Sequence, residues 1–223
     1  AYTKTRTARP PEPIGRGVNV HAQVLYDGTV TQGETSSGEF ETNKKTPSLD
    51  DFKEMLQKVE EGFNQEKVMI KIEVQNATKN ENISVIFKKM LNSLNGPQTL
   101  DKLKEYGQRA HATNDTVFFF FTTKDILQET AHGDKVPIQL LSIETHGTFC
   151  STDISAAVVT YVPQMYGYEF AMEAITRIFG SNKYKHFSRS DRKRMNQTFS
   201  RCHIDPSIKA EGERNETGLQ SSA

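Results

Sequence analysis

The sequence has little cysteine, no excess of charge of either sign and no long apolar run. Its 223 residues include 28 Lys and Arg against 28 Asp and Glu, so the net charge is zero. A neutral chain has no overall field that would hold it on nucleic acid or on an anionic membrane. No apolar stretch approaches the roughly 20 residues that span a bilayer. We therefore expect no nucleic-acid partner and no membrane span, and any partner must be recognised locally.

Several features are typical of secreted proteins. The chain begins at Ala1 with a polar run, so we expect a processed or trimmed start. The only two cysteines, Cys150 and Cys202, suit one disulfide in an oxidising compartment, whereas two buried free thiols in a cytosolic protein are the less favoured alternative. Five Asn-X-Ser/Thr sites favour secretion and glycosylation, at Asn76, Asn82, Asn114, Asn196 and Asn215.

The length favours a single domain with extensions at both ends. Residues 1–16 contain a proline-rich run and several basic residues, which predicts an extended arm that does not pack. Residues 17–205 are predicted to form the domain. Residues 206–223 are polar and are predicted to be a disordered tail.

Hydrophobic periodicity predicts an α/β fold with a mixed sheet. Extended segments are predicted at residues 18–26, 68–74, 116–122, 136–149 and 156–161, with a loop at 29–46. Helices are predicted at residues 48–63, 82–94 and 99–112, from about 166 and from 188. The run from Thr116 to Thr122 is apolar without interruption, which is typical of a central strand buried on both faces. Ser48 and Asp51 have the spacing of a capping box.

Four segments together resemble reprolysin-type metalloproteases, the group found in venoms, in tick saliva and in membrane-anchored disintegrin proteases. They are Thr99–Tyr106 with Asn114–Asp125, Val18–Asp27 with Leu49–Val74, Gly147–Cys150, and Phe187–Cys202. The resemblance covers most of residues 18–202. It implies a metzincin-like fold, in which a mostly parallel sheet with an antiparallel edge strand is packed by three to four helices. It also implies that Cys150 pairs with Cys202.

The diagnostic motif of that family, His-Glu-X-X-His-X-X-Gly-X-X-His, is degenerate here. With Gly180 as the anchor, Glu173 and Arg177 stand at the first two histidine positions and Lys183 at the third. Ala174 stands at the catalytic glutamate. Protonated Arg and Lys cannot coordinate zinc, and Ala cannot act as a general base. We therefore expect a non-catalytic protein that binds no metal and no cofactor.

Glu173 and Arg177 are four residues apart on the predicted helix, with the acidic residue first, which favours an ion pair. Our hypothesis is that this pair occupies the former zinc position. The alternative is an ordinary surface pair that contributes about 0.3–0.5 kcal/mol.

Three functions remain open from the sequence. The first is a secreted pseudoprotease that binds an extracellular protein or peptide through the former active-site cleft or along the sheet edge. Residues 137–145 resemble the edge at which the family binds substrates, with Gln139 and Ser142 as polar contacts, unless a glycan or a loop covers it. The second is binding of a sulfated glycan by a basic cluster, made of Lys183, Lys185, Arg189, Arg192, Lys193 and Arg194. The third is hydrolysis without zinc, with Asp153, Glu169, Glu173 and Asp191 as candidate carboxylates.

Overall fold

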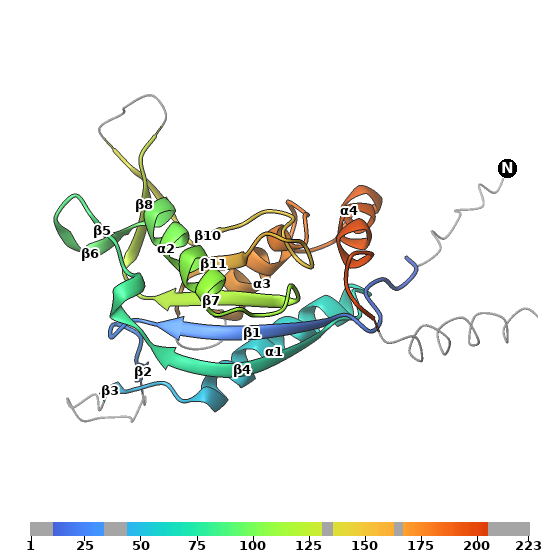
Figure 1. The fold of residues 1–223 in the computed structure, drawn as a ribbon, viewed down its shortest axis with the longest axis horizontal. Helices are drawn as coiled ribbons and strands as arrows, with labels where there is room; N and C mark the ends of the chain where they lie inside the picture. The colour runs from blue at the N-terminus through green and yellow to red at the C-terminus, as the bar shows by residue number, and fades with distance from the viewer. Residues whose placement is uncertain (1–10, 34–43, 131–135, 163–166, 205–223) are drawn as a thin grey trace, which may run out of the picture.

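The protein is built around a five-stranded sheet. A computed structural model describes residues 11–33, 44–130, 136–162 and 167–204 (Figure 1). The strands lie in the order β10-β11-β7-β1-β4, and only β10 is antiparallel to its neighbour. They span β1 (Asn19–Tyr26), β4 (Lys71–Lys79), β7 (Thr116–Thr122), β10 (Ser142–Glu144) and β11 (Ser155–Thr160). The predicted α/β class, with a mostly parallel sheet and an antiparallel edge strand, is confirmed.

Helices cover both faces of this sheet (Figure 1). The helices are α1 (Leu49–Gln65), α2 (Gly96–Arg109), α3 (Gly167–Ile178) and α4 (Arg189–Phe199). Side chains alternate across a strand, so the four phenylalanines of β7 divide between two cores. Phe119 and Phe121 join the core beneath α1 and α3, while Phe118 and Phe120 join the one beneath α2. Every residue of β7 is buried, as its apolar run predicts.

The predicted starts of two helices are correct. At α1, the Ser48 side chain accepts a hydrogen bond from the Asp51 N–H, and the Asp51 carboxylate accepts one from the Ser48 N–H at 2.6 Å. Ser188 and Asp191 form a second capping box at α4. Each box satisfies backbone N–H groups that have no partner within the helix.

The predicted helix at 82–94 is wrong. This segment forms a short 3-10 helix, η1 (Glu81–Ile83), and then the hairpin of β5 (Ile86–Phe87) and β6 (Met90–Asn95). Lys88 and Lys89 make the turn with φ angles of 44° and 66°, values that lysine rarely adopts, so the sequence carries no turn signal. The predicted helix stop at Asn95 is instead the N-cap of α2, where its side chain accepts from the Gln98 N–H at 3.1 Å.

The hairpin belongs to a second, four-stranded sheet in the order β5-β6-β8-β9. It includes β8 (Asp125–Gln128) and β9 (Ile138–Leu140), and β9 leads directly into β10. The predicted loop at 29–46 also contains a short antiparallel pair, β2 (Gln32–Gly33) with β3 (Lys44–Lys45). Within the described ranges, no helix is both long and apolar enough to cross a bilayer.

The predicted N-terminal arm is packed where it is described. The Ile14 N–H donates to the Lys67 carbonyl at 3.0 Å, and the Met69 N–H donates to the Ile14 carbonyl at 2.7 Å. Ile14 also packs against the core. The expectation of an unpacked arm is therefore wrong for this part, while residues 1–10 and the predicted tail lie outside the described residues.

Candidate functional site

The predicted binding edge is an edge in the structure, because β10 pairs only with β11 among the described residues. Beside β10, the Leu141 carbonyl accepts a backbone N–H of β11, and the Thr145 N–H donates to a backbone carbonyl of β11, both at 2.9 Å. Backbone groups of successive residues point to opposite sides of a strand. The N–H and C=O groups of Ser142 and Glu144 therefore point away from β11, where an added strand would pair.

Exposed apolar side chains lie along the same edge. Ile138 in β9 and Leu141, which joins β9 to β10, are each 50% exposed. β9 is an edge of the second sheet and β10 an edge of the first, and with Leu141 between them they form the stretch 138–144. We call this stretch the β9–β10 edge. Gln139, predicted as a polar contact, is exposed, but its side chain donates to Asp125 at 2.8 Å.

Arg177 joins α3, the helix on which the sequence resemblance places the degenerate zinc motif, to this edge. Its Nη2 lies 2.5 Å from Glu173 Oε1, which is the pair expected from the sequence, and its Nη1 lies 2.8 Å from Glu144 Oε1. The second Glu144 oxygen accepts the Ser142 hydroxyl at 2.8 Å. The side chain of Glu144 is only 7% exposed, against 26% for Glu173. We call Glu144, Glu173 and Arg177 the arginine cluster.

The arginine cluster keeps Arg177 charged. Burial lowers the pKa of the guanidinium, but the hydrogen bond and charge of Glu144, together with the charge of Glu173, outweigh burial and raise that pKa above its ordinary value. A charged guanidinium has donors only, so it can neither ligate a metal nor accept a proton. Arg177 therefore links β10 to α3 and offers no acid–base group of its own.

The other two positions that the resemblance assigns to a zinc motif are not part of the arginine cluster. Ala174 is fully buried in the core beneath α3, and Lys183 is exposed in the loop that follows Gly180. Within the described parts of the chain, no three His, Cys, Asp or Glu side chains gather as a metal site would require. Met195, which the sequence places in the core of α4, is fully buried there.

A polar hollow of about 400 Å³ lies where β10 ends. Lys104 and Gln108 of α2 line one side, and Thr145 and Thr148 line the other. The Thr148 hydroxyl lies 2.8 Å from that of Thr145 and 3.0 Å from that of Ser155, which fixes the loop against β11. Asp153 and Ile154 line the same hollow, which therefore presents hydroxyl, amide, ammonium, carboxylate and apolar groups.

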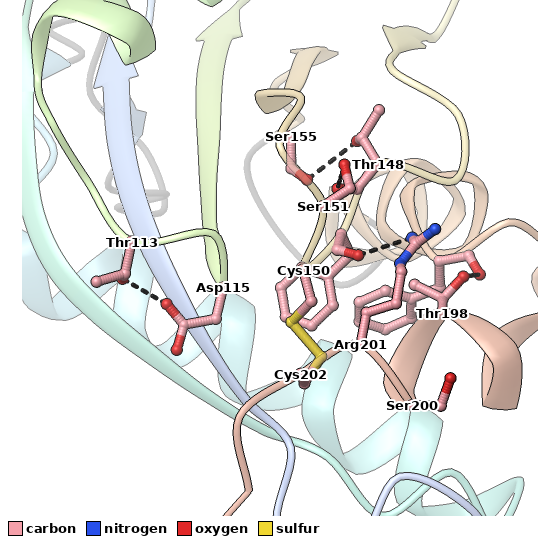
Figure 2. The surroundings of a disulfide bond; sticks show 12 residues. Thr113, Asp115, Thr148, Cys150, Ser151, Ser155, Thr198, Ser200, Arg201 and Cys202 are labelled. Atoms are coloured by element: carbon pink, nitrogen blue, oxygen red, sulfur yellow. Dashed lines mark hydrogen bonds between the residues drawn. A yellow bond between two sulfur atoms is a disulfide. The ribbon is translucent and has the colours of Figure 1, made fainter.

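The predicted disulfide between Cys150 and Cys202 is present, with the two Cα atoms 5.0 Å apart. It links the loop before β11 to the segment after α4. Figure 2 shows Arg201 beside it, where Nη2 donates to the carbonyls of Gly147 at 2.7 Å and Phe149 at 2.8 Å. These contacts fix the loop that carries the hydroxyl groups of the hollow.

Arg192 does not belong to an exposed basic cluster, so that part of the prediction is wrong. It is only 9% exposed. Its guanidinium donates to the carbonyl of Glu66 at 2.8 Å, to that of Lys67 at 3.2 Å and to that of Glu12. Carbonyls at a helix end have no partner within the helix, and here Arg192 satisfies those that follow α1 while holding the N-terminal segment in place.

Two more of the six basic residues are paired within the protein. Lys185 Nζ lies 2.7 Å from Glu169, and Arg194 Nη2 lies 2.6 Å from Asp191. These contacts reduce the positive charge that is available to an anion. Of the six, those that are exposed and form no ion pair with another described residue are Lys183, Arg189 and Lys193.

The candidate carboxylates of a hydrolase are dispersed. Glu169, Glu173 and Asp191 are each held by a different basic residue, and Asp153 is exposed in the loop before β11. The structure does not bring any two of them together by a hydrogen bond.

Four of the five predicted glycosylation sites lie in described segments, and all four are exposed. Asn76 is in β4, Asn82 in η1, Asn114 before β7 and Asn196 in α4. Asn215 lies outside the described residues. None of the four is on the β9–β10 edge.

No protein-family model matches the chain, and no curated protein matches it in sequence. The resemblance to reprolysin-type proteases therefore remains an expectation from the motifs. Glu144 is the site residue that sequence reasoning missed. Glu144 and Ser142 are two positions apart, so they lie on the same face of a strand. No local pattern links Glu144 to Arg177, which lies 33 positions away.

Proposed function

We propose that the protein is a secreted, non-catalytic, metalloprotease-like protein that binds an extended peptide segment of an extracellular partner along the β9–β10 edge. The observation that carries this proposal is the outward direction of the Ser142 and Glu144 backbone groups. An added strand gains its affinity from such groups and its specificity from side chains at alternate positions. It requires no metal and no catalytic base.

Two further observations support the binding of an extended peptide. Leu141 and Ile138 offer exposed apolar contacts beside the outward-pointing backbone groups, although Ser142 itself is only 7% exposed. Arg177 fixes Glu144 from the α3 side, so the strand is already ordered before a partner arrives. An ordered edge reduces the conformational entropy that binding would otherwise cost.

Binding of a sulfated glycan is a weaker candidate, since only three residues of the basic cluster are both exposed and without an ion pair to a described residue, namely Lys183, Arg189 and Lys193. Elution from a heparin column at low salt would count against it. Hydrolysis without zinc receives no support from the dispersed carboxylates.

The test is a selection from a random peptide library displayed on phage, followed by affinity measurements with a synthetic copy of the selected peptide. Ser142→Pro removes one outward N–H, and Lys79→Pro is the matched control on the opposite edge strand, β4. We expect Ser142→Pro to weaken binding by about tenfold or more and Lys79→Pro to leave it unchanged.

Backbone methylation of the peptide tests the same contact without altering the protein. Methyl groups on alternate amide nitrogens should abolish binding in one register and spare it in the other. A selected peptide that binds the wild type and Ser142→Pro equally well, and tolerates methylation in both registers, would show that the edge is not the binding site.

A further inference from the structure

The sheet has a second edge, and it is much the longer of the two. β4 has nine residues, so it extends about 30 Å, against about 10 Å for β10. Among the described residues, no strand pairs with its outer side. A long edge with unpaired backbone groups is a template for pairing with a second copy of the chain.

The direction of the backbone groups in β4 follows from its hydrogen bonds. The Lys71 N–H donates to the Val18 carbonyl at 3.0 Å, and the Asn80 N–H donates to the Tyr26 carbonyl at 2.8 Å, so both N–H groups face β1. Alternation then turns the N–H groups of Ile72, near one end, and Lys79, near the other, outward.

Both ends of this outer edge are protected. The outward N–H of Ile72 donates to the Glu60 carboxylate of α1 at 2.7 Å, so this position cannot pair with another strand. Lys71 and Lys79 are exposed, and lysine is the side chain that natural edge strands favour as protection against pairing. Glu73 adds a side chain that is 74% exposed, so the part of the strand without a charge runs from Val74 to Thr78.

The middle of the strand has an irregular register and an acceptor site. The pairing with β1 shifts between Ala22 and Gln23, so β4 carries one extra residue, Gln75, next to Asn76. Asn76 is exposed, and Thr78 completes its Asn-X-Thr site. Acceptor sites are expected in surface loops, so one within a long edge strand calls for a physical reason.

We infer that Asn76 carries an N-linked glycan that shields the β4 edge against pairing with a second copy of the protein. A glycan is bulky and hydrated, and at this position it excludes a neighbouring strand from the part of the edge that charge does not protect. The β9–β10 edge, which has no acceptor site, then remains the edge that is open to a partner. The inference rests on the secretion that belongs to the proposed function.

The experiment uses the full chain secreted from eukaryotic cells. Peptide mass spectrometry measures the occupancy of Asn76, and size-exclusion chromatography with light scattering measures self-association over a range of concentrations. Asn76→Gln and Thr78→Ala both remove the glycan, whereas Asn196→Gln removes one from α4. The double variant Asn76→Gln/Lys79→Pro lacks the glycan and also an outward N–H of β4.

We expect Asn76 to be occupied, and both variants without its glycan to self-associate at a concentration about tenfold or more below that of the wild type and Asn196→Gln. Lys79→Pro should reverse this self-association, which distinguishes edge pairing from general loss of solubility. An unmodified Asn76 would overturn the inference. So would Asn76→Gln and Thr78→Ala proteins that stay monomeric wherever Asn196→Gln does.

The outcome is separable from that of the proposed function. Peptide affinity at the β9–β10 edge is measured on the same variants and should not change when the Asn76 glycan is removed. If no peptide binds but loss of the glycan causes self-association, the inferred role of the Asn76 glycan is supported and the proposed function is refuted. If peptides bind but the glycan has no effect, the reverse holds.

Discussion

Replacing Arg177 by Met should destabilise the protein by more than an ordinary surface pair would explain. The change removes the donor that lies 2.8 Å from Glu144, whose side chain is only 7% exposed. The carboxylate would keep only the Ser142 hydroxyl. Leaving a fully buried charge unpaired costs about 3–5 kcal/mol. Because one third of Arg177 is exposed and water can reach it, we expect about 2 kcal/mol.

A double-mutant cycle separates the two carboxylates of the arginine cluster. Glu144→Gln should couple to Arg177→Met by about 1–2 kcal/mol, since the pair is largely shielded from water. Glu173→Gln should couple by well under 1 kcal/mol, because Glu173 is 26% exposed. Urea unfolding of the three single and two double variants measures both values.

Two results would refute the role of Arg177 in holding β10. If Arg177→Met costs less than about 0.5 kcal/mol, or if its effect adds to that of Glu144→Gln without coupling, the cluster does not hold β10 against α3. In that case, the preordered edge that the proposed function invokes would lose its support.

Two other predictions concern stability. Burial raises the pKa of Asp191, but hydrogen bonds from Ser188, Ser181 and Arg194 outweigh it and hold that pKa below its ordinary value of 3.8. Asp191 therefore stabilises the fold above about pH 4, and this contribution is lost as the pH falls. Asp191→Asn should cost about 1–3 kcal/mol at pH 7, and the difference from wild type should shrink in acid; a constant difference in urea unfolding down to about pH 2 would refute this. Replacing Cys150 and Cys202 by Ser opens a link between residues 52 positions apart, which should cost about 4 kcal/mol in thermal unfolding, and an unchanged melting temperature would contradict it.

The elements that the sequence predicts well depend on local physics. β7 is a run of apolar residues, so burial on both faces follows directly from composition. The starts of α1 and α4 follow from capping boxes in which both partners are three residues apart. The hairpin at 86–95 was not predictable in this way. Its apolar residues have helical spacing, and the φ angles of Lys88 and Lys89 are imposed by the packing of the second sheet.

The site depends on contacts between distant segments, and the sequence predicts only part of it. The pair of Glu173 and Arg177 lies within one helix turn and was expected. The hydrogen bond from Arg177 to Glu144 is not predictable from the sequence, because it forms only when β10 packs beside α3. Arg192 was expected at the surface on account of its charge. It is buried instead, because the carbonyls that follow α1 need donors.

We propose that the arginine cluster stands where a reprolysin-type protease would hold zinc and that the protein binds peptides without cutting them. The most direct measurement is the zinc content of the purified secreted protein, taken together with its peptide cleavage before and after treatment with a chelator. We expect far less than one zinc per chain and no peptide cleavage that the chelator abolishes. One zinc per chain, removed by the chelator with loss of peptide cleavage, would contradict it.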